Sequence, residues 1–367
     1  MKASDARYAL WLALTLCNIA PSRYFKLMER YGAAGDVFKA AANGTVALEG
    51  RNAEVLCAEL KEKATESYID KCSLYLKKHA IEAILFDDES YPALLRHIHS
   101  PPPVLFVKGK FKTDIELPIA IIGSRKCSAY GKKTAFTLAS ELARAGVCIV
   151  SGLAFGIDAQ SAAGALSVEE SDFPTIAVLG CGVDVVYPKE NVELYNKIVE
   201  RGAVLSEFLP GTKPHKTHFP RRNRIISGIS RGLVVVEAAS RSGTSITANY
   251  ALEQGRDVFA VPGRITDMMS EGTNRMLADG IAKMVLSAAD VLEDYGLSAY
   301  VQTQKQERVL ELAGEQKNIY ELLTLGERSF DELIELTGIQ AGRLNSALTE
   351  LEFSGIIKQS PGRVYEI

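Results

Sequence analysis

Between residues 81 and 295, short apolar runs alternate with stretches whose apolar residues recur at helical spacing. Most of these runs are apolar throughout rather than at every second residue, which is typical of strands buried on both faces of a sheet. Strands of this kind that alternate with helices predict an α/β domain with a Rossmann-like, largely parallel sheet. The runs are Ile81–Phe86, Val104–Val107, Ile119–Ile122, Val147–Val150, Thr175–Leu179, Ala203–Leu205, Leu233–Val236, Val258–Val261 and Lys283–Leu286, with helices expected over Lys132–Ala145, Val192–Arg201 and Ser245–Gln254.

Residues 1–80 have a different, wholly helical pattern. The first two helical stretches and the turn between them look like a helix-hairpin-helix, in a small helical domain of that or the SAM type. The turn, Asn18–Pro21, has no glycine that would let backbone N–H groups approach a phosphate. A packing or partner domain is therefore favoured over a DNA contact at this turn, although both interpretations stay open. Helical spacing covers Tyr8–Leu16, Tyr24–Tyr31 and Val55–Leu76.

Residues 296–310 are polar and predict a linker, after which residues 311–367 form a third pattern. Three helices followed by two short strands predict a winged helix. Ser329, with Glu332 three residues later, predicts a capping box, and Gly338 is placed to end the second helix. The expected helices are Lys317–Leu325, Phe330–Leu336 and Ala341–Ser354, and the two strands flank Gly362.

Composition excludes several classes of protein. The net charge of −3 means that any surface for nucleic acid has to be local. No apolar run approaches the length of a membrane span, and the first residues lack a basic leader and a cleavage site, so we expect a cytoplasmic protein without membrane contact. The six cysteines are scattered, and none lies near the histidine pairs His97/His99 and His215/His218. We therefore expect no disulfide framework, no metal site and no cofactor.

Four short polar segments follow predicted strands. In open α/β sheets, ligands bind at the carboxyl ends of the strands, where glycine allows close approach and helix N-termini offer N–H groups to an anion. Arg125 would add a bidentate contact to a phosphate. Several such segments at one edge favour a phosphate site over simple turns. They are Gly123-Ser124-Arg125, Ser151-Gly152, Gly180-Cys181-Gly182 and Ser242-Gly243-Thr244.

The segment Phe208–Val236 concentrates positive charge and contains neither Asp nor Glu. Basic groups neutralise phosphates, and an aromatic face can stack on an unpaired base. We interpret the segment as a basic loop for single-stranded nucleic acid; the alternatives are a solvated face and, for Phe219, a core residue that anchors the loop. The residues concerned are Lys213, Lys216, Phe219, Arg221, Arg222, Asn223, Arg224 and Arg231.

Motifs of catalysis are missing from the sequence. It contains no GxSxG elbow, no Walker lysine loop and no HExxH motif. Asp158, Asp184 and Glu237 lie near the ends of strands or loops, where they could act as active-site acids. We expect them to orient arginines or cap helices instead, which favours a binding protein over an enzyme.

The motifs of the α/β region resemble those of one family, DNA-processing protein A, also called DprA or Smf. Their order and number cover the whole α/β region, and the flanking helical and winged-helix regions are similar to arrangements found in many members. The matching stretches are Ile122–Gly131, Ser151–Asp158, Gly180–Pro188, Ser206–Gly211, Phe219–Gly228, Val236–Ala238, Ser242–Thr244, Ala260–Gly263 and Gly272–Asn274.

This resemblance implies a recombination mediator that binds single-stranded DNA entering the cell during natural transformation. Such proteins dimerise through the Rossmann-like domain and load the RecA recombinase onto the strand. All the candidate strand contacts lie within residues 81–295, so we expect that span alone to bind the strand. By motif position, Arg125, Lys216 and Phe219 would line the pocket, while Arg221, Arg222 and Arg224 would add charge or hold the loop.

Two other function classes remain as alternatives. Ser242–Thr244 and Glu237 look like parts of the nucleotide site of the lysine-decarboxylase-like nucleoside monophosphate hydrolases, although the loop lacks that family's Pro-Gly-Gly. A transcription regulator would read DNA with its winged helix. The helix expected to do so carries one cation, Arg343, before its end and includes Glu350 and Glu352, which suits a partner at least as well as a DNA groove.

Overall fold

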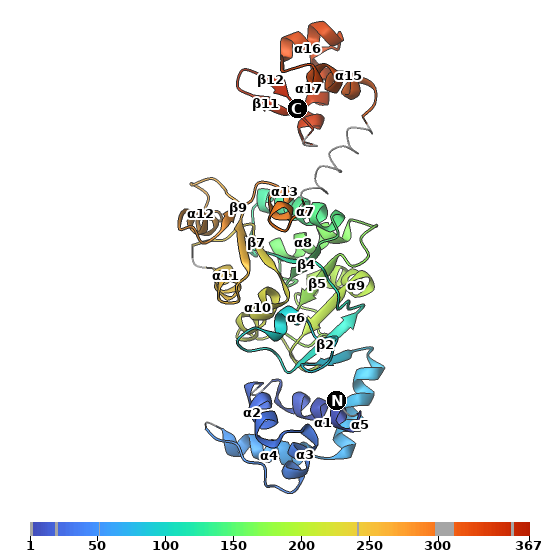
Figure 1. The fold of residues 1–367 in the computed structure, drawn as a ribbon, viewed down its shortest axis with the longest axis vertical. Helices are drawn as coiled ribbons and strands as arrows, with labels where there is room; N and C mark the ends of the chain where they lie inside the picture. Colours follow the sequence, from blue (N-terminus) through green and yellow to red (C-terminus); the bar gives the residue numbers. More distant parts are fainter. Residues whose placement is uncertain (1–2, 19–20, 51, 241, 298–311, 354–355) are drawn as a thin grey trace. The chain divides into compact units, whose positions relative to one another are not determined.

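The structure is a computed structural model that describes residues 3–18, 21–50, 52–240, 242–297, 312–353 and 356–367 (Figure 1). The chain divides into two compact units, Met1–Ala288 and Ala289–Ile367. Most of the predicted linker, the turn residues 19–20 and Ser354 at the end of the last predicted helix lie outside the described residues.

The described strands of the first unit form a nine-stranded sheet in the order β1-β2-β6-β5-β4-β3-β7-β8-β9. β1 pairs with β2, and β2 with β6, in antiparallel fashion, whereas the other neighbours are parallel. The predicted fold class is therefore confirmed. The strands are β1 (Glu82–Leu85), β2 (Val104–Gly109), β3 (Pro118–Ile122), β4 (Cys148–Ser151), β5 (Thr175–Val178), β6 (Ala203–Ser206), β7 (Gly232–Val235), β8 (Asp257–Ala260) and β9 (Lys283–Met284).

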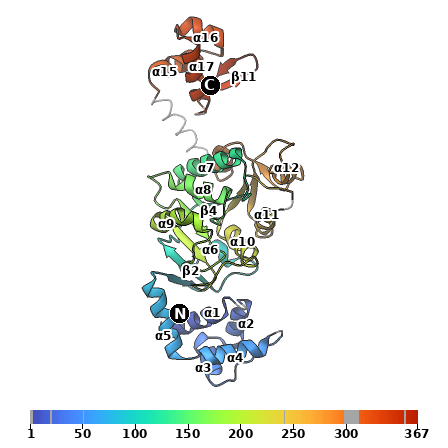
Figure 2. The same ribbon diagram turned by 180° about the vertical axis from the view of Figure 1, so that it is seen from behind.

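Successive residues of a central strand supply two different cores, because their side chains point to opposite faces of the sheet. In β5, Ile176 and Val178 belong to one buried cluster and Ala177 to the other. Helices cover both faces, which explains why the strands are apolar throughout. α7 (Ala129–Arg144), α8 (Ile157–Leu166) and α9 (Val192–Arg201) lie on one side, and α10 (His218–Ile229) and α11 (Gly243–Glu253) lie on the other (Figure 1, Figure 2).

The direction of strand order reverses between β3 and β7. From β3 the chain proceeds through β4 and β5 to β6 on one side, and from β7 it proceeds through β8 to β9 on the other. The loops after β3 and β7 therefore diverge and leave a crevice at the carboxyl ends of these strands. Shorter elements complete this part of the unit: α6 (Ala93–Arg96), the 3-10 turn η1 (Lys189–Asn191) and α12 (Glu271–Ala278).

The helical region contains more helices than the sequence predicted. The stretch predicted over Val55–Leu76 is two helices, because Thr65 Oγ1 accepts a hydrogen bond from Tyr68 N at 3.2 Å and starts a new one. α3 was not predicted. The helices are α1 (Ala3–Leu16), α2 (Ser22–Tyr31), α3 (Ala34–Ala42), α4 (Ala53–Lys63) and α5 (Glu66–Lys78).

One hydrophobic core joins the helical region to the sheet. Trp11 and Leu12 of α1 belong to the same buried cluster as Phe106 of β2 and Val204 of β6. Elements α1 and α5 also contact β1. Residues 1–80 are thus packed onto the α/β region through shared apolar burial.

The second unit contains the winged helix, as predicted. Ser329 and Glu332 form the capping box, and Gly338 ends the second helix in a left-handed conformation with φ 66°. β10, β12 and β11 form a three-stranded sheet in that order. The elements are α13 (Ala288–Asp294), which starts at the boundary, then α15 (Gly314–Thr324), β10 (Arg328–Ser329), α16 (Phe330–Thr337), α17 (Ala341–Phe353), β11 (Lys358–Ser360) and β12 (Val364–Glu366).

Candidate functional site

A cavity of about 580 Å³ lies at the carboxyl ends of β3 and β7, where the strand order reverses. Ser151, Gly152, Arg221 and Arg224 are not among the described residues of its wall. The other predicted site residues line it together: Gly123, Ser124, Arg125, Lys216, Phe219, Arg222, Asn223, Ser242, Gly243 and Thr244.

Backbone contacts hold the loop after β3 in place. Ser124 N donates to Glu237 O at 2.8 Å, and Ser124 O accepts from Ile157 N at 3.3 Å. Gly156 packs so closely on this loop that an added Cβ would lie 2.3 Å from Ser124 O, and its φ of +79° independently favours glycine. The loop is therefore a rigid support that presents Arg125 in an exposed position at the cavity.

Positive charge at the cavity comes from Arg125 and Lys216. Both side chains are exposed, and neither forms an ion pair with a carboxylate in the described part of the chain. The guanidinium of Arg125 lies over the ring of Phe219, 5.1 Å from its centroid. Cations without a compensating carboxylate are available to the phosphates of a ligand.

The aromatic surface of the cavity is formed by Phe219 and Tyr187. Their ring centroids are 5.6 Å apart, and Tyr187 is 39% exposed. The Phe219 ring also packs on Gly180, where an added Cβ would lie 2.8 Å from the ring. Phe219 is therefore partly an anchor and partly a face of the cavity. Sequence reasoning missed Tyr187, although it lies inside the matched stretch Gly180–Pro188.

The N-terminus of α11 forms another part of the wall. Ser242 precedes the helix in an extended conformation, and its side chain does not cap the first turn. Its Oγ is buried and has no hydrogen-bond partner among the described residues. Free N–H groups at a helix start attract anions, and Ser242, Gly243 and Thr244 place such a helix start at the wall of the cavity.

The interpretation of Phe208–Val236 as a loop is wrong at its centre, because residues 218–229 form α10. The helix turns Arg222 and Arg224 inward, where they are only 4% and 8% exposed. Their burial was not visible in the sequence, because Arg221, Arg222 and Arg224 stand within four residues and nothing in that order marks which of them turn inward. These two arginines hold the site and are not presented to a ligand as open cations.

Arg222 ties the ends of two strands together. Its Nη1 donates to Gly152 O at 2.8 Å and to Val178 O. Burial lowers the pKa of Arg222 to about 10, with the neighbouring Asp158 carboxylate acting in the opposite direction, so it is a cation at neutral pH. Gly152 is required by this packing, because an added Cβ would lie 2.4 Å from the guanidinium. Ser151 is fully buried and is not among the described residues that line the cavity.

The three carboxylates near strand ends have structural partners. Glu237 holds a helix end, as expected, whereas Asp184 binds loop backbone and a tyrosine hydroxyl rather than an arginine or a helix end. Asp158 accepts from Gly152 N at 3.0 Å, and Asp184 accepts from Gly211 N at 2.7 Å. Glu237 accepts from Ser128 N at 2.9 Å and from Ser128 Oγ at 2.5 Å, at the N-terminus of α7. The Glu237 carboxylate thus occupies the anion site of that helix, so the nucleotide-hydrolase alternative is not favoured.

Among the described residues, no group of three or more His, Cys, Asp or Glu side chains is arranged to hold a metal ion. None of the helices in the described ranges has the length and apolar character needed to cross a bilayer.

Fold and site together define a ligand-binding α/β protein with a cationic, aromatic crevice at the switch point of a doubly wound sheet. A family model described as DNA recombination-mediator protein A matches residues 82–296, and one described as the DprA winged helix domain matches residues 303–363. The chain therefore belongs to the DNA-processing protein A (DprA) family, and the resemblance seen in the sequence is confirmed.

Known relatives cover most of the chain. It is 40% identical over 248 residues to the DNA processing protein DprA of Bacillus subtilis, covering 66% of this chain and 81% of the relative. The X-ray structure of DNA processing protein A from Streptococcus pneumoniae is 35% identical, with a TM-score of 0.66 over 78% of this chain and 97% of that one. A structure of the Helicobacter pylori protein, described for its single-stranded DNA binding mode, is 30% identical, with a TM-score of 0.53 over 59% and 95%.

Proposed function

We propose that this chain binds single-stranded DNA in the cavity at the ends of β3 and β7, and that it is a recombination mediator in natural transformation. One observation carries the proposal: two exposed cations, Arg125 and Lys216, line one cavity together with Phe219 and the N-terminus of α11, and the guanidinium of Arg125 lies over the Phe219 ring. Cations and helix N–H groups suit the phosphates, while the aromatic ring suits a base.

The arrangement favours a single strand over a duplex. A base can stack on Phe219 or Tyr187 only when it is unpaired and free to leave its neighbours, whereas a duplex keeps its bases stacked inside. The proposed contacts are to phosphates and to the face of a base. They do not include a helix that reads base edges, which supports binding with little dependence on sequence. The single-stranded DNA binding described for the Helicobacter pylori relative supports the same assignment.

We further propose that the chain loads RecA onto the strand, works as a homodimer and resides in the cytoplasm. The description of the matching family as a recombination mediator supports RecA loading. Support for the dimer comes from β9, the last strand of the sheet, near which Ile281 and Met284 are 41% and 55% exposed. Exposed apolar side chains at a sheet edge favour pairing with a second copy.

The proposal is for a binding protein without catalytic activity. The carboxylates of Asp158 and Glu237 are committed to hydrogen bonds that shape loops and helix ends. In the winged helix, Arg343 pairs with Glu315 at 2.8 Å, which reduces the positive charge that α17 could offer to a duplex. This pairing supports a protein partner for the winged helix.

A titration of the full chain with a labelled oligo-dT strand, and with a duplex of equal length, tests the proposal at several salt concentrations. We expect tighter binding of the single strand. Arg125→Ala and Lys216→Ala should each weaken it and reduce the slope of log K against log salt by about 0.7, because each loses one phosphate contact. Lys110→Ala, at an exposed lysine outside the cavity wall, is the control. Equal affinity for both DNA forms, or wild-type slopes in both cavity variants, would contradict the proposal.

A further inference from the structure

The segment that carries Lys216 and Phe219 runs from the end of β6 into α10. Residues of the helical region form hydrogen bonds to it on both sides of Lys216 and Phe219. On one side, Asn18 follows α1 directly and contacts the segment twice. Its Oδ1 accepts from Leu209 N at 3.1 Å, and its Nδ2 donates to Thr212 Oγ1 at 3.0 Å. A single side chain thus holds two points of a segment about 190 residues away in sequence.

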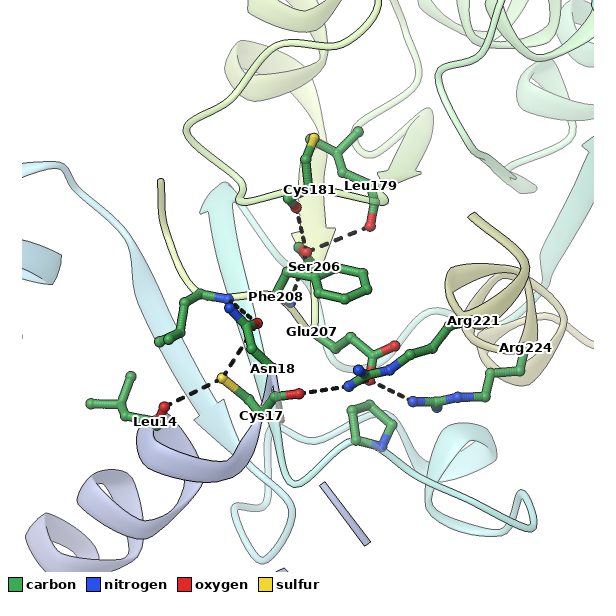
Figure 3. Close-up of polar contacts among 12 residues, drawn as sticks. Leu14, Cys17, Asn18, Leu179, Cys181, Ser206, Glu207, Phe208, Arg221 and Arg224 are labelled. Carbon is green, nitrogen blue, oxygen red and sulfur yellow. Dashed lines mark hydrogen bonds and ion pairs between the residues drawn. The ribbon is translucent and has the colours of Figure 1, made fainter. Parts of the chain in front are cut away.

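On the other side, Arg221 joins the end of α1 to α10. Its Nη2 donates to the backbone oxygen of Cys17 at 2.6 Å and to Glu207 Oε2 at 2.8 Å (Figure 3). Glu207 is 1% exposed and also pairs with Arg224 at 2.5 Å. A carbonyl at the C-terminal end of a helix attracts a cation, and a buried carboxylate holds one firmly, so this bridge has a defined geometry.

A further contact comes from α5. Tyr75 OH donates to Asp184 Oδ2 at 2.9 Å, and the other oxygen of Asp184 accepts from Gly211 N at 2.7 Å. Thr212 O in turn accepts from Gly182 N at 2.9 Å. Residues 209–212 are therefore attached to α1, to α5 and to the loop after β5, immediately before Lys216.

We propose that the end of α1 positions the strand-binding segment, with Asn18 as the positioning residue. The inference rests on the proposed function, and it gives the helical region a role at the site without a contact to DNA. An anchored segment presents Lys216 and Phe219 in one arrangement, whereas a freed segment has to be ordered when the strand binds, and that ordering weakens binding. This role goes beyond the expectation that residues 81–295 alone bind the strand.

The test uses the full chain with Asn18→Ala, which removes both side-chain hydrogen bonds. The freed segment then has to be ordered when the strand binds, so we expect oligo-dT to bind about three- to tenfold more weakly, a loss of roughly 0.7–1.4 kcal/mol. The salt slope should stay at the wild-type value, because no phosphate contact is lost. Asn18→Asp keeps an acceptor for Leu209 N and one for the Thr212 hydroxyl, and should bind within about twofold of wild type.

A second measurement follows the opening of the segment's own backbone. Hydrogen exchange of residues 207–217 should be faster in Asn18→Ala than in wild type, because anchored backbone opens less often. The matched control is Arg7→Ala, which breaks an exposed ion pair with Glu66 and Asp70 inside the helical region and should change neither measurement. Thr212→Val removes one of the bonds without altering α1, and should show the same direction of change in both measurements.

The outcomes separate this inference from the proposed function. If Lys216→Ala weakens binding and Asn18→Ala leaves affinity and exchange at wild-type values, the positioning role is overturned and the strand site stands. If neither Arg125→Ala nor Lys216→Ala has an effect on binding, the proposed function fails. Exchange of residues 207–217 then decides alone whether Asn18 anchors the segment: faster exchange supports the positioning role, and unchanged exchange overturns it.

Discussion

The wall of the cavity and the interior behind it both contain arginines, but the two regions use them differently. On the wall, Arg125 is exposed and has no carboxylate partner among the described residues. Arg222 at the bottom of the cavity and Arg224 behind it are buried, with carbonyl oxygens and the Glu207 carboxylate as acceptors. The first arrangement leaves charge for a ligand, and the second uses charge to join strands and helices.

The difference comes from desolvation. A buried guanidinium has lost its water and has to be compensated by fixed acceptors, so its removal leaves those acceptors without partners. An exposed guanidinium keeps its water until a phosphate replaces it. A count of basic residues in the sequence therefore overstates the charge available for binding, and the variants below separate the two uses.

The largest effect is expected for Arg222→Ala. It leaves Gly152 O, Val178 O and the Asp158 carboxylate without their cation, and should lower the free energy of unfolding by about 3–5 kcal/mol. Arg125→Ala, the matched control on the wall, should change it by less than about 0.5 kcal/mol. Urea denaturation of both variants measures the difference. Similar losses in the two variants would mean that the wall and interior arginines are equivalent.

A smaller effect is expected for Phe219→Leu, which keeps apolar packing against Gly180 but removes the aromatic face. Stacking on an aromatic ring contributes about 1–3 kcal/mol per base, so the free energy of binding oligo-dT should become less favourable by up to about 3 kcal/mol. The salt slope should not change, which distinguishes this variant from Lys216→Ala. Phe136→Leu on α7, at a ring that is 38% exposed, is the control. Wild-type affinity in Phe219→Leu would assign Phe219 to anchoring alone.

The smallest effect concerns His218 at the start of α10. Its ring stacks on Phe208 at 4.2 Å, and Nδ1 lies 3.2 Å from Gly180 O. Burial lowers the pKa of His218, so the unfolded chain binds the proton more readily than the folded one. Its contribution to stability is present above the unfolded pKa of about 6.5 and is lost as pH falls through the lower folded pKa.

His218→Asn, which can still donate to Gly180 O, should therefore lose less stability than wild type on acidification. Thermal melts between about pH 7.5 and about pH 5 measure this difference. If the stability of the variant falls more steeply than that of wild type on acidification, folding raises the pKa of His218 instead of lowering it, and the prediction is wrong.

Several parts of the fold and site were predictable because their signals are local. The run Thr175–Leu179 indicated a strand buried on both faces, and β5 occupies Thr175–Val178. Glycine-containing segments after strands located Gly123–Arg125 and Ser242–Thr244 at the cavity. Tyr187 was missed because nothing local separates an aromatic residue of a cavity from one in a turn.

By itself, the sequence determined the Rossmann-like class of the α/β region, the winged helix and the edge of the sheet at which the cavity lies. These follow from the period of apolar residues and from the strand–loop–helix order, which act over a few neighbouring residues. Only the tertiary structure decided which cations face the cavity and that the end of α1 reaches the segment between β6 and α10. Those features depend on desolvation and hydrogen bonds between distant residues, such as Asn18 with Leu209 and Arg221 with Glu207.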